Sequence, residues 1–212
     1  MRILIVLTYF QPHKSGLTLY AVRQAQALAA RGHHVTVLTS QYDSALPLEE
    51  WNQGVRIVRL PVAFRLSKGV IMPRMPFKVW NLLLESDIVN LHVPQMDAAL
   101  VTLLAKLQGK PVVLTYHCDL KMPAGLINKA AGWSAGIANR ISAGLADVIV
   151  HNTLDFAENS PFLQDYLDKL QVIPPPIIVD PVSQEDIERF RERYGIQSDD
   201  RVVGMVARLA TE

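Results

Sequence analysis

Two histidines stand at the ends of short apolar runs, and they are the residues of this chain best placed to do chemistry. His92 ends the run in DIVNLHVP (residues 87–94), and His117 ends the run in PVVLTYHCDL (residues 111–120). Runs of this length that are rich in Val, Ile and Leu predict strands buried on both faces. Because ligands of open parallel sheets bind outside the carboxyl ends of the strands, we expect each histidine at the edge of a ligand crevice.

His117 can serve such a crevice in more than one way. It can donate a hydrogen bond to a hydroxyl or a phosphate, or act as an acid or base. A purely structural histidine at a strand end fits the spacing equally well. His92 follows the same logic with weaker support, because Val93-Pro94 follows and can turn it inward. Neighbours in an extended segment point to opposite faces, so His117 is badly placed to activate Cys118, which we expect to be a small buried residue.

A second candidate site is the loop TYFQPHKSG (residues 8–16), which follows the first predicted strand. Backbone N–H groups at the start of a helix favour a phosphate, although a lone Gly16 there also fits a simple turn. A dinucleotide-binding fold would have G-x-G-x-x-G in this loop, so a nicotinamide enzyme is disfavoured. The sequence has no Asp-x-Asp pair and no Cys/His cluster with metal spacing, so we expect no metal site.

A doubly wound α/β fold is expected to position these residues. Apolar residues at helical spacing over residues 99–107 predict a helix between the two histidine-bearing strands, so that the three segments form a crossover. The same reasoning predicts strands at residues 3–8, 34–39, 54–60, 147–150 and 171–173, and helices near residues 17–30 and 121–146. We therefore expect a mostly parallel, Rossmann-like sheet flanked by helices.

Residues 61–84 are predicted to be irregular, because prolines and a glycine interrupt them at Pro61, Gly69, Pro73 and Pro76. This segment contains no acidic residue, and its cations are Arg65, Lys68, Arg74 and Lys78. One interpretation is a solvated surface loop that happens to be basic. The other is a mobile loop that meets an anionic acceptor or a membrane surface, since apolar and basic residues alternate there.

The sequence PPPIIVDP (residues 174–181) indicates a domain boundary, because three consecutive prolines form a stiff, extended connector. Beyond it, Ser183, an acidic first turn and Gly195 predict a capped helix over residues 183–194. Residues 201–207 predict one more strand. We therefore expect a Rossmann-like domain at residues 1–173, a linker at residues 174–182 and the start of a second domain at residues 183–212.

Bulk composition narrows the class of protein further. The formal net charge of +1 argues against a nucleic-acid partner. A single cysteine excludes an internal disulfide framework and fits a reducing compartment. No apolar run approaches the roughly 18 residues of a membrane span, and the short run MRILIVL is better explained as a first strand than as a signal peptide. We therefore expect a soluble, cytoplasmic protein.

Taken in order, these segments resemble the N-terminal half of a family 4 (group 1) retaining glycosyltransferase with the two-domain GT-B fold. The pieces that carry the resemblance are residues 1–28 with Gly16, then RGHHVTVLT, DIVNLHVP, GKPVVLTYHCDL, LADVIVHNT, KLQVIPPPI and VVGMVARLATE. Each piece is modest alone, but their order and spacing cover essentially the whole chain.

The resemblance implies a role for individual residues. Ser15 and Gly16 match the loop that approaches the nucleotide-sugar phosphates and the acceptor. His117 matches the histidine that hydrogen-bonds the transferred sugar, and Arg208 matches an arginine that holds the donor diphosphate. The family often has two glycines and an acidic residue shortly after in this loop, and this chain departs from that pattern with Ser15 and Thr18. Thr18, His92 and Asp119 are therefore candidates for the acceptor side of the site.

The implied activity is a retaining, metal-independent transfer of a hexose from a nucleotide sugar to a glycan or lipid-linked acceptor, as in polysaccharide biosynthesis. No cofactor is implied besides the donor substrate, and peripheral contact with the inner face of the membrane fits the basic segment. Family residues that hold the donor, a lysine and a pair of glutamates, have no match here, so we expect these 212 residues to be inactive alone. A non-catalytic sugar- or nucleotide-binding module and a sugar-nucleotide epimerase of the same fold are the alternatives.

Overall fold

The computed structural model describes residues 1–66, 69–119, 125–177, 181–197 and 199–205. The chain divides into two compact units, Met1–Pro176 and Ile177–Glu212. In chain order the elements of the first unit are β1 (Arg2–Val6), α1 (Gly16–Ala30), β2 (His34–Gln41), β3 (Glu49–Asn52), β4 (Val55–Pro61), β5 (Phe64–Leu66), β6 (Gly69–Ile71), α2 (Met75–Leu84), β7 (Ile88–Val93), α3 (Ala98–Leu107), β8 (Val112–Tyr116), α4 (Leu126–Leu145), β9 (Val148–His151), α5 (Leu154–Asn159), the 3₁₀ helix η1 (Leu163–Lys169) and β10 (Leu170–Val172). The second unit contains α6 (Gln184–Tyr194).

The first unit is built on an eight-stranded sheet with the order β10-β9-β8-β7-β1-β2-β4-β3. All neighbouring strands are parallel except β3, which pairs antiparallel with β4 at the edge. This mostly parallel sheet with helices on its faces confirms the predicted Rossmann-like class. Strand order reverses at β1, because β2 continues the sheet on one side of it and β7 on the other.

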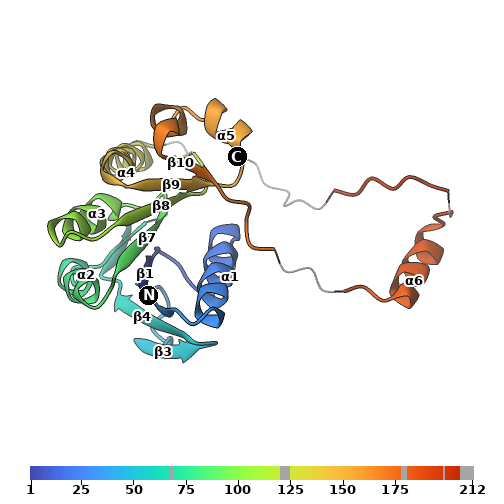
Figure 1. Cartoon of the computed structure of the whole chain (residues 1–212), viewed down its shortest axis with the longest axis horizontal. Helices are drawn as coiled ribbons and strands as arrows, with labels where there is room; N and C mark the ends of the chain where they lie inside the picture. Colours follow the sequence, from blue (N-terminus) through green and yellow to red (C-terminus); the bar gives the residue numbers. More distant parts are fainter. Residues whose placement is uncertain (67–68, 120–124, 178–180, 198, 206–212) are drawn as a thin grey trace. The chain divides into compact units, whose positions relative to one another are not determined.

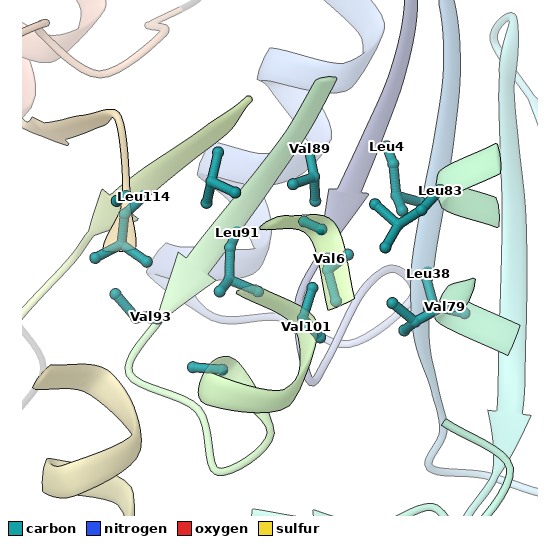
Figure 2. Packing of buried hydrophobic residues seen from close by; sticks show 14 of the residues in the cluster. Leu4, Val6, Leu38, Val79, Leu83, Val89, Leu91, Val93, Val101 and Leu114 are labelled. Atoms are coloured by element: carbon teal, nitrogen blue, oxygen red, sulfur yellow. The ribbon is translucent and has the colours of Figure 1, made fainter. Parts of the chain in front are cut away.

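Helices cover the sheet in two layers (Figure 1). α2, α3 and α4 lie side by side on one face, and α1 lies on the other. Alternate residues of β1 serve both faces: Leu4 and Val6 belong to the larger apolar cluster, and Ile3 and Ile5 to the smaller one beneath α1. Figure 2 shows how residues of the larger cluster pack together, with Leu4, Val6, Val89 and Leu91 among those labelled. Burial on both faces is what parallel strands require.

The segment at residues 61–84 differs from the prediction of an irregular loop. It contains the β5–β6 hairpin and the ten-residue helix α2. Pro76 lies in the first turn of α2, where a missing N–H costs nothing and the fixed φ favours a helix. Val79, Leu82 and Leu83 then bury one face at helical spacing. The prolines therefore begin a helix here.

Two smaller expectations also change. The polar connection before β4 contains the edge strand β3, whose residues alternate too weakly in polarity to predict a strand. The strand predicted at residues 201–207 is absent from its described part, because residues 201–205 belong to no strand. Residues 206–207 lie outside the described residues.

Local side-chain and glycine signals fix several helix ends, as predicted for Ser183 and Gly195. Ser15, Thr153 and Ser183 each accept a hydrogen bond from a backbone N–H in the first turn of α1, α5 and α6. Gly195 ends α6 with a φ of +66°, a left-handed conformation that favours glycine. No helix in the described ranges is both long and apolar enough to span a bilayer.

Candidate functional site

The candidate site lies at the carboxyl ends of the strands beside β1, where strand order reverses. Crevices of open α/β sheets form at such a switch point. His92 lies near the end of β7, and His117 directly follows β8. Register pairs His92 with Thr115, so His117, two residues further along, points to the same face of the sheet. The sheet thus brings the two predicted histidines together.

The two imidazoles form one stacked, hydrogen-bonded pair. His92 Nδ1 lies 2.8 Å from His117 Nε2, and the ring centroids are 5.1 Å apart with an interplanar angle of 17°. On its other side, His92 Nε2 lies 3.0 Å from Gln24 Oε1 of α1. Tyr20, one helical turn before Gln24, meets both rings edge-on, with centroid distances of 5.9 and 5.0 Å. The helix and the sheet together hold the pair in place.

Burial keeps both histidines neutral at physiological pH. His92 is 1% exposed, and burial, followed by the neighbouring His117, holds its pKa well below the usual value. Burial lowers the pKa of His117 to about 4, with a further contribution from His151. Desolvation disfavours the charged imidazolium, so the pair acts through neutral rings.

His151 completes a group of three histidines at this edge of the sheet. It lies at the end of β9 and is buried. Its Nδ1 lies 2.8 Å from the carbonyl oxygen of Tyr116, the last residue of β8. Because a carbonyl can only accept, His151 donates from Nδ1.

The start of α1 forms the second wall of the site. Ser15 Oγ accepts from the backbone N–H of Thr18 at 3.1 Å and donates to Thr18 Oγ1 at 3.0 Å. Thr18 Oγ1 in turn donates to the carbonyl of Tyr9 at 3.2 Å, and Thr18 is buried. Thr18 and Ser15 therefore shape the loop with their side chains.

Gly16 has open space beside it. A Cβ added at this residue would meet no atom within 4 Å, and its backbone does not need a positive φ. Gly16 lies one helical turn before Tyr20, whose ring contacts His117. Packing within the described protein therefore gives no reason for a glycine here, whereas close approach of a ligand to the backbone would.

Arg59, a buried residue of β4, fixes the loop before α1 through hydrogen bonds. Its guanidinium donates to the carbonyl of Gln11 at 3.0 Å and to that of Pro47 at 3.1 Å, and it pairs with Glu50. Arg59 is 2% exposed, and its Nε has no hydrogen-bond partner in the described chain. Arg59 thus positions the loop that leads into Ser15 and Gly16, a role that sequence reasoning missed.

The remaining predicted residues lie apart from the histidine pair or outside the described chain. Asp119 Oδ1 accepts from Tyr116 Oη at 2.8 Å and from Ser160 Oγ at 2.7 Å, and it ties the end of β8 to the segment after α5. Cys118 is exposed, so the expectation that it is buried was wrong. Arg208 lies outside the described residues.

Sequence reasoning missed the groups that support His117, although a signal for part of them exists. Polar residues alternate with apolar ones as Asn90-x-His92 in β7 and Thr115-x-His117 in β8. Asn90 Nδ2 donates to Thr115 Oγ1 at 3.0 Å, so these strands share one polar stripe. That alternation distinguishes them from uniformly apolar strands. The only sequence signal for Tyr20 and Gln24 is their helical spacing, which places them on one face of α1.

No set of three or more His, Cys, Asp or Glu residues within the described ranges is arranged to hold a metal ion. What the site offers is a neutral imidazole, a helix start with exposed backbone N–H groups, and open space at Gly16. These groups can hydrogen-bond hydroxyls and phosphate oxygens.

Both the sequence and the fold of this chain are similar to those of known proteins. The family model described as "Glycosyl transferase 4-like domain" matches residues 15–176. Sucrose-phosphate synthase from Thermosynechococcus elongatus is similar with a TM-score of 0.59 and 16% identity over 93% of this chain and 53% of that one. WaaG, described as a glycosyltransferase involved in lipopolysaccharide biosynthesis, gives a TM-score of 0.56 and 18% identity over 92% of this chain and 52% of its own. No curated protein matches the sequence significantly.

At these low identities, the structural similarity shows a shared fold alone. The chain spans about half the length of each of these two solved structures.

Proposed function

Because the chain belongs to the glycosyl transferase 4-like domain family and has the fold of the N-terminal half of a GT-B glycosyltransferase, we propose that it forms the acceptor-side half of a retaining hexosyltransferase. The donor is a nucleotide sugar, and the acceptor is a glycan or a lipid-linked saccharide. The observation that carries this proposal is the placement of His117 at the switch point of the sheet, beside the open start of α1.

The chemistry requires no nucleophile from the protein. The bond between the anomeric carbon and the diphosphate oxygen breaks, and the acceptor oxygen forms its bond on the same face. The acceptor proton passes to an oxygen of the leaving diphosphate. The start of α1 would lie near the diphosphate, where backbone N–H groups and the helix dipole favour negative charge, and His117 would hydrogen-bond the sugar.

The experiment is a transfer assay with the full-length enzyme and a panel of nucleotide sugars. His117→Ala should lower turnover by about a hundredfold, since a hydrogen-bonding or proton-transferring side chain contributes that much. His34→Ala is the matched control, because that histidine is exposed on β2 and distant in the sheet from β8. Both proteins should show the same far-UV circular dichroism.

The product decides between the proposal and its alternatives. An elongated saccharide with retained configuration supports transfer, whereas an epimerised nucleotide sugar or binding without turnover would contradict it. Equal turnover of wild type and His117→Ala would remove His117 from the site.

We also propose that the acceptor side meets an anionic membrane through the outer helix surface, by which we mean the exposed apolar residues of α2, α3 and α4. These residues are Phe77, Trp80, Leu84, Leu103, Leu107, Trp133, Ile137, Ile141 and Leu145. They recur at intervals of three or four residues along each helix, so each helix presents an apolar stripe away from the sheet. Figure 1 shows the three helices side by side on one face.

The positive charge of this surface favours an anionic partner. The three helices contain no acidic residue, and their cations are Lys78, Lys106, Lys129 and Arg140, with Arg74 at the start of α2. Lys106 pairs with Asp147, but the other four form no ion pair among the described residues. Exposed aromatic rings beside unpaired cations favour the interface of an anionic bilayer. Arg74 and Lys78 of the basic segment expected to be a loop therefore belong to this helical surface, whereas Arg65 lies in β5 and Lys68 lies outside the described residues.

Co-sedimentation with vesicles tests this surface. Wild type should sediment with phosphatidylglycerol vesicles at low salt and much less with phosphatidylcholine, because exposed charges are screened as salt rises. Phe77→Ser with Trp80→Ser, and separately Arg74→Glu with Lys78→Glu, should abolish sedimentation. Trp51→Ser is the control, because Trp51 is 69% exposed on the edge strand β3. A protein that forms dimers through this surface and never sediments with vesicles would overturn the proposal.

A further inference from the structure

Gln24 closes the buried end of the histidine pair. Its Oε1 faces His92 Nε2 at 3.0 Å, while His92 Nδ1 faces His117 Nε2 at 2.8 Å. Gln24 comes from α1 and the histidines from β7 and β8, so three separate elements meet in one line of hydrogen bonds. None of these contacts involves a backbone group that secondary structure already requires.

The direction of this line follows from the inventory of donors and acceptors. An amide oxygen only accepts, so His92 donates from Nε2. A neutral imidazole has one N–H, so His92 Nδ1 holds a lone pair and accepts. His117 must then carry its proton on Nε2, which leaves the lone pair on its Nδ1.

This assignment of the tautomers requires that both rings are neutral, and burial keeps them neutral. His92 is fully buried, and desolvation lowers the pKa of both rings. His117 is only partly buried, and its Nδ1 makes no hydrogen bond within the described chain. The lone pair on Nδ1 of His117 is therefore the part of the two-histidine group that remains available to a ligand.

We propose that Gln24 and His92 are positioning residues that fix the tautomer of His117, so that His117 accepts a hydrogen bond from a hydroxyl of the bound sugar. The tautomer assignment stands on the geometry of the pair, and the identity of the ligand rests on the proposed function. A ring that accepts at Nδ1 selects a hydroxyl and disfavours a phosphate oxygen, which would meet it lone pair to lone pair. This differs from the sequence-based expectation, in which His117 donates a hydrogen bond to a hydroxyl or a phosphate, because the Nε2 proton of His117 is directed to His92.

Nitrogen NMR of the 212-residue chain reads the tautomers directly. In a two-bond ¹H–¹⁵N correlation spectrum at pH 7, with signals assigned through His92→Ala and His117→Ala, both rings should carry the proton on Nε2. Gln24→Met removes the acceptor with little change in volume, so His117 should shift to a mixture of tautomers. Gln24→Leu, a second apolar replacement, should give the same mixture of tautomers, so the test does not depend on the folding of one variant.

Gln26→Met is the matched control, because Gln26 lies two residues along the same helix, where successive side chains point in different directions. It should leave both rings unchanged. A proton on Nδ1 of His117 in the wild type, or an unchanged spectrum in Gln24→Met, would overturn the proposal.

Kinetics of the full-length enzyme then separate this inference from the proposed function. Donors that each lack one hydroxyl should include one that lowers kcat/KM in the wild type, and for that donor Gln24→Met should cause no further loss. Such non-additivity identifies the hydroxyl that His117 contacts. If the tautomers are as expected but no sugar is transferred, the proposed function fails and the assignment of the pair stands. If every deoxy donor responds equally to Gln24→Met, the hydroxyl contact is wrong.

Discussion

At the scale of single residues, the site depends on two imidazoles kept neutral in contact with each other. Two protonated rings with nitrogens 2.8 Å apart would repel strongly, and burial adds a desolvation cost to each charge. Tyr20 and Gln24 enclose the pair from α1. Neutral rings can form directed hydrogen bonds without net charge, and such bonds suit the uncharged sugar of the proposed function better than an anion.

This neutrality makes stability depend on pH. The unfolded chain protonates His117 near pH 6.5, but the folded chain does so only near pH 4. Between these values the unfolded state binds more protons than the folded state. The contribution of His117 to the free energy of unfolding is therefore fully present above pH 6.5 and is lost as the pH falls towards 4. Urea denaturation should show that the free energy of unfolding decreases from pH 7 to pH 4.5. This decrease should be about 2 kcal/mol smaller in His117→Gln than in wild type.

A matched substitution controls for general acid effects. His34→Gln changes an exposed histidine on β2, so its loss between the two pH values should equal that of wild type. Equal losses in wild type and His117→Gln would mean that His117 titrates alike in the folded and unfolded chains.

At the scale of elements, the start of α1 joins a residue that caps the helix to one that has open space beside it. Ser15 caps the helix, and Gly16 follows it with no neighbour that a Cβ would meet. Arg59 fixes the loop before them through the carbonyl of Gln11. The loop is therefore held by a buried group, while Ser15 and Gly16 are exposed.

Two neighbouring alanine substitutions should have opposite effects. Ser15→Ala removes the cap and should lower the free energy of unfolding by about 1 kcal/mol. Gly16→Ala should leave stability unchanged or raise it by up to about 1 kcal/mol, because alanine favours a helix and has room here. In the full-length enzyme, however, Gly16→Ala should raise the KM for the donor, because the new methyl occupies the open space.

Chemical denaturation and donor kinetics measure the two halves of this prediction. A destabilised Gly16→Ala protein would show that the glycine serves the fold. A stable variant with unchanged donor kinetics would show that no ligand approaches the backbone at this point.

Elements with strong local signals were predicted well. The strands bearing His92 and His117, the helix between them and the cap at Ser183 are confirmed. α2 was not predicted, because prolines interrupt its sequence, although Pro76 lies where a helix begins. β3 was missed because an edge strand that is open to solvent shows little apolar patterning.

At the scale of the whole molecule, the two units differ in how they are stabilised. The unit Met1–Pro176 has apolar clusters on both faces of its sheet. In the unit Ile177–Glu212, α6 buries none of its residues, and Ile187, Phe190 and Tyr194 are exposed along it. α6 is instead supported by local interactions: the Ser183 cap, acidic residues in its first turn and arginines in its last.

Transfer is expected to need more than these 212 residues. Since the chain spans about half of the solved structures that it matches, we predict that the purified chain transfers no radiolabelled hexose under conditions where the full-length enzyme does. The physical reason is that cations on the donor side offset the charge of the leaving diphosphate. Transfer by the purified chain at a rate near that of the full-length enzyme would contradict this prediction.

The sequence by itself determined the parallel strands of the sheet, most helices and the cap at Ser183, because apolar periodicity and capping side chains act within a few residues. It also placed His117 at a strand end. Only the tertiary structure decided that His92 supports His117, that Gln24 and Tyr20 enclose them, and that Arg59 fixes the loop before Gly16. These relations depend on strand register and on the reversal of strand order at β1, which join residues far apart in the sequence: 68 positions in the bond between His92 and Gln24, and more in the contact between Tyr20 and His117. No local pattern encodes such pairs, because their energy appears only after the sheet has formed.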